Sequence, residues 1–209
     1  AHLRCEPALL IGLTTIELSR ELFEPVWQTE LPTTPGKNLM QMLDAAQQHT
    51  LKALWAVGYD VYLTNPNTSR TRQSLEALDC VVVQDLFLNE TAREFGTVFL
   101  PAASSFEKYG TFMNAERRIQ PVRKALEPIG ESKPDWLIVC ELARALGKGE
   151  GFGFESAEQI WEEIRRVWKP GAGISYARLE HGGLQWPCPS EDHPGTTRMH
   201  QETFPIGPR

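Results

Sequence analysis

The chain has 209 residues, of which 41% are hydrophobic, and its 21 basic and 27 acidic side chains give a net charge of -6. This length can bury a substantial core in one or two domains, and the acidic balance argues against nucleic acid as the main partner. No stretch approaches the roughly 20 apolar residues that span a bilayer, and residues 1–16 lack a basic start followed by an apolar block. We therefore expect a cytoplasmic protein without a membrane span.

The four cysteines lie far apart and form no CxxC or CxxxC set, which argues against a metal ribbon or a disulfide framework. They are Cys5, Cys80, Cys140 and Cys188. We expect reduced, partly buried thiols. The chain begins at Ala1 without an initiator methionine and ends in the loop-like stretch Phe-Pro-Ile-Gly-Pro-Arg, so we expect both ends to continue into a longer polypeptide.

The first part of the chain carries weak signals. Residues 1–37 are assigned only as a connector, in which residues 15–26 could form an amphipathic helix and residues 31–36 are rich in proline. Asn38 is a suitable N-cap, and the apolar residues that follow it at helical spacing predict a helix as far as Gln48.

Apolar runs then alternate with segments of helical spacing. The predicted strands cover residues 51–57, 80–83 and 97–100, and the predicted helices cover residues 68–78 and 89–95. Short β-branched runs of this kind are typical of strands buried on both faces of a parallel sheet. The pattern predicts an α/β fold with a doubly wound, mostly parallel sheet of the dinucleotide-binding type over residues 38–110.

The pattern changes after Gly110, where we expect helical and irregular segments from a neighbouring domain. Residues 116–124 alternate enough to form an extended ribbon. Two helices follow, one opened by Pro134-Asp135 and ended by Gly147, and one capped by Ser156.

The expected boundaries place the ribbon and its two helices in residues 111–168. Residues 169–209 are rich in Gly and Pro and have no periodicity. We expect this irregular tail to wrap a surface rather than to build a core.

Polar residues follow the first two predicted strands. Gly58 lets a backbone approach an anionic ligand, and Asp60 could accept from a ribose hydroxyl, although a plain βα turn explains the same pattern. After the second strand, a carboxamide and a carboxylate stand side by side at Gln84 and Asp85. This pair suits a purine edge, since guanine offers two adjacent donors, although Asp85 could instead cap the next helix.

The third strand ends at Pro101 and enters a polar loop around Gly110. Its hydrogen-bonding residues are Ser104, Ser105, Glu107, Lys108, Thr111 and Asn114. Arg117 and Arg118 add a guanidinium pair that could bind phosphate in a bidentate manner, although surface ion pairs with Glu116 are an equal alternative. Ligands of open α/β sheets bind beyond the carboxyl ends of strands, so this loop is a candidate cofactor site.

The sequence shows no nucleophile with a neighbouring base. The histidines, which lie in or near expected loops and termini, are His2, His49, His181, His193 and His200. The set Cys188, His193 and His200 matches no standard zinc spacing. We therefore assign no catalytic and no metal-ligating residue.

Several segments resemble the molybdopterin oxidoreductases. They are Ala53-Leu-Trp-Ala-Val-Gly-Tyr-Asp60, Val83-Gln-Asp-Leu-Phe-Leu-Asn-Glu-Thr91, Phe99-Leu-Pro-Ala102 and Gly110-Thr-Phe-Met-Asn-Ala-Glu-Arg-Arg118. Leu184-Gln-Trp-Pro-Cys-Pro189, with Pro194-Gly-Thr196 and Glu202-Thr-Phe204, is similar to the formate dehydrogenase catalytic (alpha) subunit in particular. The family commonly has a Gly-Glu-Asn/Asp-Pro turn where this chain reads Gly58-Tyr-Asp-Val61.

The resemblance implies an internal fragment of a molybdenum-dependent formate dehydrogenase, which oxidises formate to carbon dioxide and passes electrons to an iron-sulfur cluster. The implied cofactor is molybdopterin guanine dinucleotide with molybdenum or tungsten. The implied partners are formate, the rest of the polypeptide and an electron-acceptor subunit or redox protein. The resemblance places Gly58, Asp60, Gln84, Asp85, Phe87 and Thr91 at the guanosine diphosphate, and Glu107, Gly110, Thr111 and Asn114 near the pterin, with Arg117 as a further cofactor-binding candidate.

The family's N-terminal cysteine cluster, its metal-ligating Cys or selenocysteine, its active-site Arg and its C-terminal cofactor-closing domain are not among these residues. We therefore expect the fragment to be inactive alone and the cluster to be ligated elsewhere. The strand-end motifs do not select a substrate. Another family member such as a nitrate reductase, or a non-catalytic electron-transfer scaffold of the same fold, is therefore an alternative.

Overall fold

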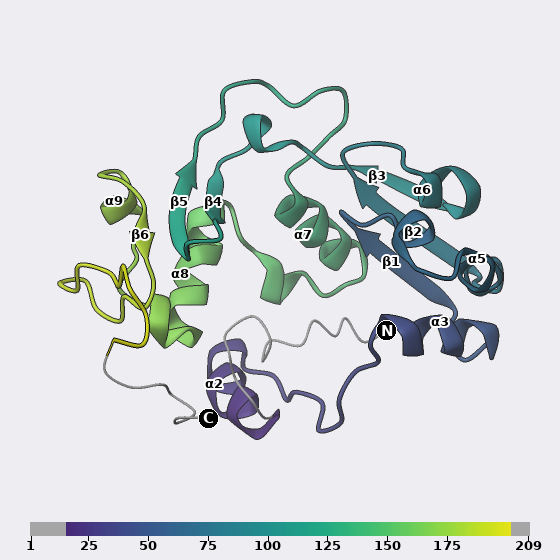
Figure 1. The fold of residues 1–209 in the computed structure, drawn as a ribbon, viewed down its shortest axis with the longest axis horizontal. Helices are drawn as coiled ribbons and strands as arrows, with labels where there is room; N and C mark the ends of the chain where they lie inside the picture. The colour runs from purple at the N-terminus through teal and green to yellow at the C-terminus, as the bar shows by residue number, and fades with distance from the viewer. Residues whose placement is uncertain (1–15, 202–209) are drawn as a thin grey trace.

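The structure is a computed structural model that describes residues 16–201. The described residues form two small sheets, and helix α7 (Asp135–Ala145) lies between them (Figure 1). The first sheet has the order β1-β2-β3, and the second has the order β4-β5-β6. No helix in residues 16–201 is long and apolar enough to cross a membrane.

The first sheet is parallel and confirms the expected α/β fold. Its strands are β1 (Ala53–Val57), β2 (Cys80–Asp85) and β3 (Val98–Pro101). Val57 pairs with Gln84, and Asp85 pairs with Pro101, so the three carboxyl ends lie at one edge. The strand order follows the chain order through residues 16–201. Val83 and Gln84 are adjacent in the central strand, so their side chains point to opposite faces, and both are buried, as expected for a strand covered on both faces.

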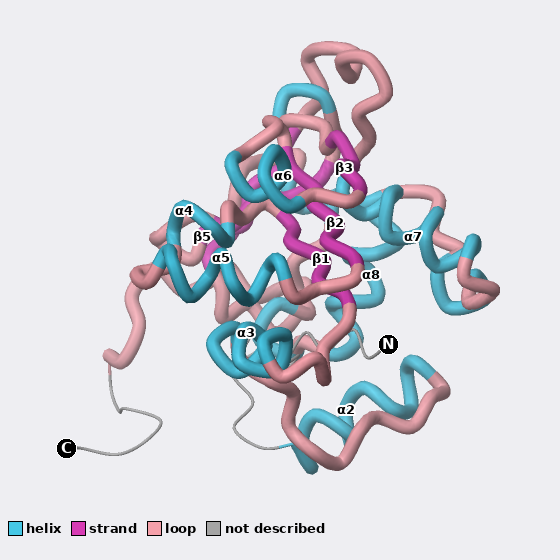
Figure 2. Tube along the Cα trace, turned by 90° about the vertical axis from the view of Figure 1, so that its right-hand side faces the viewer, coloured by secondary structure: helices cyan, strands magenta, loops and turns pink. Residues whose placement is uncertain are grey.

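Helices cover both faces of this sheet. On one side lie α3 (Leu39–Gln47), α4 (Val61–Thr64), α5 (Thr68–Glu76) and α6 (Glu90–Phe95). Figures 1 and 2 show α5 and α6 on the side of the sheet turned away from α7. The predicted N-caps are confirmed, since the side chains of Asn38 and Asn89 accept hydrogen bonds from the first turns of α3 and α6. Leu43, Val61 and Leu75 close the core beneath these helices.

The second sheet is antiparallel. Its strands are β4 (Gly110–Met113), β5 (Arg118–Val122) and β6 (Leu184–Gln185). Beside it lie α8 (Ala157–Val167), α9 (Tyr176–Leu179) and α2 (Ile16–Trp27), which packs on α8. The expected helix signals are confirmed, since Ser156 caps α8 and Gly147 follows α7 with a left-handed φ of 69°.

The tail builds a core, so the expectation that it wraps a surface is wrong for its described part. Ile174 and Cys188 have no exposed area, and Leu179 has only 1%. With Ile119 and Trp161 they form the hydrophobic cluster under the antiparallel sheet. Periodicity missed this core because its members come from turns and from single short elements rather than from one helix or strand.

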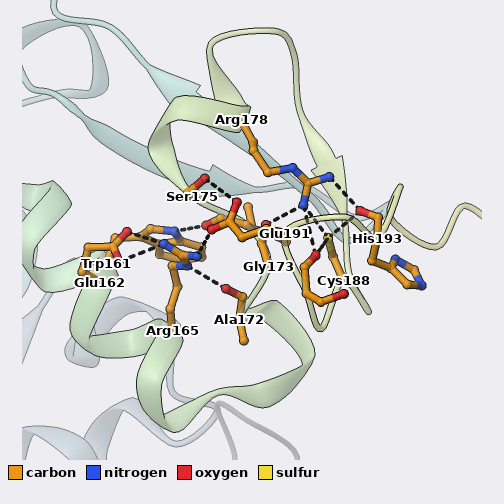
Figure 3. Close-up of polar contacts among 12 residues, drawn as sticks. Trp161, Glu162, Arg165, Ala172, Gly173, Ser175, Arg178, Cys188, Glu191 and His193 are labelled. Carbon is orange, nitrogen blue, oxygen red and sulfur yellow. Dashed lines mark hydrogen bonds and ion pairs between the residues drawn. The ribbon is translucent and has the colours of Figure 1, made fainter.

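Two arginines fix the path of the tail (Figure 3). Arg178 donates to the carbonyl oxygens of Gly173 at 2.5 Å and His193 at 2.7 Å, and its Nη1 lies 3.3 Å from the Cys188 sulfur. Arg165 donates to the Ala172 carbonyl at 2.8 Å and also pairs with Glu162 and Glu191. Trp161 donates from its indole nitrogen to the Ile174 carbonyl at 2.6 Å. These contacts supply hydrogen-bond donors to backbone carbonyl oxygens that have no partner within a helix or a strand.

Replacement of Leu179 by Ala tests whether the tail is core. We expect the free energy of unfolding to fall by about 2–5 kcal/mol, because the substitution leaves a cavity among buried side chains. Urea unfolding followed by tryptophan fluorescence measures the change. The matched control is Leu146→Ala, since Leu146 is 65% exposed at the end of α7, and it should change the free energy by no more than about 0.5 kcal/mol. Equal effects of the two substitutions would contradict a core role for Leu179.

Candidate functional site

The candidate site is the carboxyl edge of the parallel sheet. Gly58 follows β1 directly, and its backbone nitrogen donates to the Gln84 carbonyl at 2.8 Å. Its φ is 60°, a left-handed value that favours glycine. A Cβ atom at this position would meet no atom within 4 Å, so the space beside the turn is open. Backbone amides at such a turn can approach a ligand closely.

The Asp60 carboxylate joins the turns after β1 and β2. It accepts from the backbone nitrogens of Leu63 at 3.1 Å and Glu90 at 3.1 Å, and from the Thr91 hydroxyl at 2.6 Å. Partial burial acts to raise the pKa of Asp60, but the Thr91 hydroxyl and the backbone amides outweigh it and lower that pKa. The Thr91 hydroxyl in turn accepts from the backbone nitrogen of Tyr62, and Thr91 has no exposed area. The side chains of Asp60 and Thr91 therefore link the segments that follow β1 and β2.

Gln84 also lies beneath the surface, with no exposed area. Its Nε2 donates to Asp135 Oδ1 at 2.9 Å, and its Oε1 has no hydrogen-bond partner. Asp135 accepts from Lys108 at 2.7 Å through its other oxygen. Burial acts to raise the pKa of Asp135, but Lys108 and Gln84 outweigh it and lower that pKa. Sequence reasoning treated Asp135 only as a helix opener and missed this link between β2 and the loop before β4.

Asp85 is the last residue of β2 and so lies at this edge. It is half-buried, and its two oxygens accept from the Leu86 nitrogen at 2.6 Å and from Asn89 Nδ2 at 2.9 Å. Each carboxylate oxygen has two acceptor positions, so each keeps capacity for a further donor. The neighbouring Phe87 side chain is 76% exposed. An exposed ring beside a carboxylate can stack on a flat ligand while the carboxylate binds the ligand's edge.

Glu107 has a structural role in the described residues. Its carboxylate accepts from the backbone nitrogens of Ser104 and Ile129, each at 2.8 Å. The Ser104 amide, then the Ser104 hydroxyl and the Ile129 amide, lower the pKa of Glu107 against the opposing effect of burial. The residue is 6% exposed. Both carboxylate oxygens therefore bind within the protein, and the expected contact with a pterin stays a prediction.

Gly110 and Thr111 line a hollow of about 260 Å³ between β4, α7 and α8. Apolar side chains such as Trp136 and Ile160 form most of its wall, and Lys108 lies at it as well. The hollow is close to the lower limit of ligand pockets in size. Gly110 and Thr111 are therefore accessible from this side, which keeps them as candidates for contact with a bound group.

The hairpin turn uses Asn114 and Arg117 for contacts within the protein. Asn114 Oδ1 accepts from the backbone nitrogens of Glu116 at 2.9 Å and Arg118 at 3.0 Å. The Arg117 guanidinium donates to the carbonyl oxygens of Trp186 and Thr196 and lies over the Trp186 ring. The Arg117 guanidinium thus binds carbonyl oxygens of the tail, and its contact with a phosphate stays a prediction. Arg118 pairs with Glu116 at 3.6 Å and also donates to the tail, at Gly183.

The structure thus brings the first six candidates together at one edge and separates the others from it. Gly58 and Phe87 are exposed and Asp85 is half-buried, while Gln84 and Thr91 have no exposed area and Thr91 binds Asp60. In the part of the chain from residue 16 to 201, no three His, Cys, Asp or Glu side chains are grouped so that they could hold a metal ion. Cys80, Cys140 and Cys188 are free thiols.

A comparison with family models matches residues 14–145 to the molybdopterin oxidoreductases. The chain belongs to the molybdopterin oxidoreductase family. It is 40% identical over 198 residues to the F420-dependent formate dehydrogenase subunit alpha of Methanocaldococcus jannaschii, a match that covers 95% of this chain and 29% of that protein. It is also 41% identical over 188 residues to the assimilatory nitrate reductase catalytic subunit of Bacillus subtilis, with 86% of this chain and 26% of that protein covered.

The chain therefore spans less than a third of the length of these relatives. Among solved structures, acetylene hydratase from Pelobacter acetylenicus is similar, with a TM-score of 0.57 at 20% sequence identity over 84% of this chain and 25% of that one. This likeness supports the fold alone. It agrees with the three-stranded parallel sheet and its flanking helices.

The Thr91→Val substitution tests how the edge is held. Valine keeps the shape of the side chain but loses the hydroxyl that donates to Asp60 and accepts from Tyr62, so the free energy of unfolding should fall by about 1–3 kcal/mol. The pKa of Asp60 should rise toward its ordinary value. Since a lowered pKa stabilises the fold at pH values above the ordinary value of 3.8, the variant should lose less stability than the parent as the pH falls below it.

The measurement for Thr91→Val is urea unfolding at pH 7 and across the acid range, with the Asp60 carboxyl signal followed by NMR. Thr68→Val is a suitable control because Thr68 is exposed at the start of α5. An unchanged Asp60 pKa in Thr91→Val would contradict the proposed support of the edge.

Proposed function

We propose that this chain is part of the catalytic (alpha) subunit of a molybdenum-dependent formate dehydrogenase, and that it holds the guanine dinucleotide end of the cofactor. The reaction of the whole protein would be the oxidation of formate to carbon dioxide, with electrons passed to an iron-sulfur cluster. The main support is the 40% identity to a formate dehydrogenase alpha subunit across 95% of this chain. The observation that supports the holding role is the open turn at the carboxyl edge, with Gly58, Asp85 and Phe87 around it.

The residues at this edge fit a dinucleotide. The left-handed turn at Gly58 leaves open space where a phosphate or sugar can approach the backbone. Asp85 has acceptor capacity for two adjacent N–H donors, as a guanine edge presents them. Phe87 offers an exposed ring for the flat face of a base. Molybdopterin guanine dinucleotide with molybdenum or tungsten would supply the redox chemistry when bound.

The other candidates take different parts in the proposal. Asp60, Gln84 and Thr91 keep the edge rigid, which limits the reorganisation needed when a ligand binds. Gly110 and Thr111 are accessible from the hollow beside β4 and would lie nearer the pterin. For Glu107, Asn114 and Arg117 we propose indirect roles, because the contacts described above use their side chains within the protein. The cluster would be ligated outside residues 16–201.

The partners in this proposal are the remainder of the polypeptide, formate, and an electron-acceptor subunit or redox protein, with the protein located in the cytoplasm. A second candidate function is nitrate reduction. The 41% identity to the Bacillus subtilis nitrate reductase catalytic subunit favours it. The carboxyl edge does not distinguish formate oxidation from nitrate reduction, because a dinucleotide is held at a distance from the reacting substrate.

The Asp85→Ala substitution in the full-length protein tests the holding role. Loss of a hydrogen bond to a charged group costs about 1.5–3 kcal/mol, so the cofactor should be retained about 10- to 100-fold less well. Molybdenum and guanine content after gel filtration measures this. Asp79→Ala is the matched control, because Asp79 is an exposed aspartate at the opposite end of β2. Unchanged guanine content in Asp85→Ala, with native-like circular dichroism, would refute the assignment.

A substrate assay separates the two candidate functions. The full-length protein should reduce a dye with formate as donor and should show no reduction of nitrate by reduced dye. The 209-residue chain alone should show neither activity, because the expected metal-ligating residues are not part of it. Nitrate turnover by the full-length protein would favour the second candidate, and formate-dependent dye reduction by the 209-residue chain would contradict the proposed division of the site.

A further inference from the structure

Large apolar side chains are exposed on the loops that flank η1 (Ser105–Glu107). Phe106 is 65% exposed, Tyr109 63%, Leu126 61% and Ile129 80%. We call these four residues the loop face. Phe106 and Tyr109 belong to the segment between β3 and β4, and Leu126 and Ile129 belong to the segment between β5 and α7, which forms the arch in Figure 1. Contiguous exposed apolar side chains on a soluble protein indicate an interaction surface.

Hydrogen bonds hold the loop face in one arrangement. The Phe106 carbonyl accepts from the backbone nitrogens of Ala125 at 2.7 Å and Leu126 at 3.0 Å. The Glu107 carboxylate binds the Ile129 nitrogen with one oxygen and the Ser104 nitrogen with the other. Glu107 therefore ties the two loops to each other. A surface that is already ordered loses little conformational entropy when another surface packs on it.

Two ion pairs lie beside the loop face. Lys124 lies 2.5 Å from Glu127, and Lys133 lies 2.7 Å from Glu141. Such neutralised pairs give little electrostatic steering of a separate, diffusing partner. Highly apolar contact surfaces are typical of permanent interfaces rather than transient ones. The loop face therefore suits a surface that covers it from folding onward.

We propose that the loop face packs against an apolar surface of the remaining part of the same polypeptide. This inference depends on the proposed function only in that it takes the chain to be part of a longer subunit, and the relatives of which it covers 29% support that premise. The loop face offers aromatic and aliphatic side chains with one phenol hydroxyl, so it is poorly suited to hold the phosphates of a dinucleotide. The buried Glu107 carboxylate, which binds two amides, holds the loops in the arrangement that presents the loop face.

Hydroxyl-radical footprinting of the full-length alpha subunit, purified without any other subunit, tests the proposal on the unsubstituted protein. Peptides that carry Phe106, Tyr109 and Ile129 should be oxidised about tenfold more slowly than the same peptides in the urea-unfolded subunit, at both low and high protein concentration. Side chains covered by packing are shielded from solvent in this way. The measurement needs neither formate nor cofactor.

Three results would overturn the proposal. Rapid oxidation in the subunit under all conditions would show that water covers the loop face. Protection that appears only after a second subunit is added would identify a separate partner. Protection that appears only at high protein concentration would identify a second copy of the chain. A subunit that is protected at these residues but inactive with formate would contradict the proposed function and leave this inference intact.

A pair of variants gives a second measurement in the full-length subunit. Ile129→Asp places a charge in the proposed contact and should lower the midpoint of thermal unfolding by about 2–4 °C or more. Ile129→Leu keeps the apolar character and should leave the midpoint unchanged. Equal midpoints for the two variants would contradict the proposal, because a charge on a solvent-exposed loop has little effect on stability.

Discussion

The carboxylate of Asp135 is the contact on which the arrangement of the two sheets depends. It stands at the start of α7 and binds Gln84 of β2 with one oxygen and Lys108 with the other. The backbone supports the same junction, since Lys133 bonds to Pro101 and Ala103. The lowered pKa of Asp135 means that this contact stabilises the fold above the ordinary carboxyl pKa and is lost as the pH falls through the folded value.

Some polar groups at the carboxyl edge bind other parts of the protein, and others keep acceptor positions for a further donor. The Asp60 carboxylate binds Thr91 and three backbone amides, whereas each oxygen of Asp85 accepts one donor and keeps an acceptor position. Both carboxylates lie at the carboxyl end of a strand, and the two positions look alike in sequence. The two carboxylates differ in the number of hydrogen-bond donors that the fold brings to each. Four donors reach Asp60, from Leu63, Glu90 and Thr91.

Local signals allowed much of the fold to be predicted, and distant contacts account for what was missed. The caps at Asn38, Asn89 and Ser156 are read from a few adjacent residues, and each is found in the structure. In contrast, Glu107 bonds to an amide 22 residues away, and Arg117 reaches carbonyls 69 to 80 residues away. Such partners cannot be read from spacing, because only the folded chain brings them together.

The two hairpin arginines bind the tail through its main chain. Arg117 and Arg118 donate to the carbonyl oxygens of Trp186, Thr196, Thr197 and Gly183. Every residue type supplies the same carbonyl group, so the identities of the tail side chains matter little to these contacts, while the route of its backbone matters a great deal. These contacts therefore constrain the length and route of the tail backbone, and a lysine in place of Arg117 could not reproduce the planar fork that spans several acceptors.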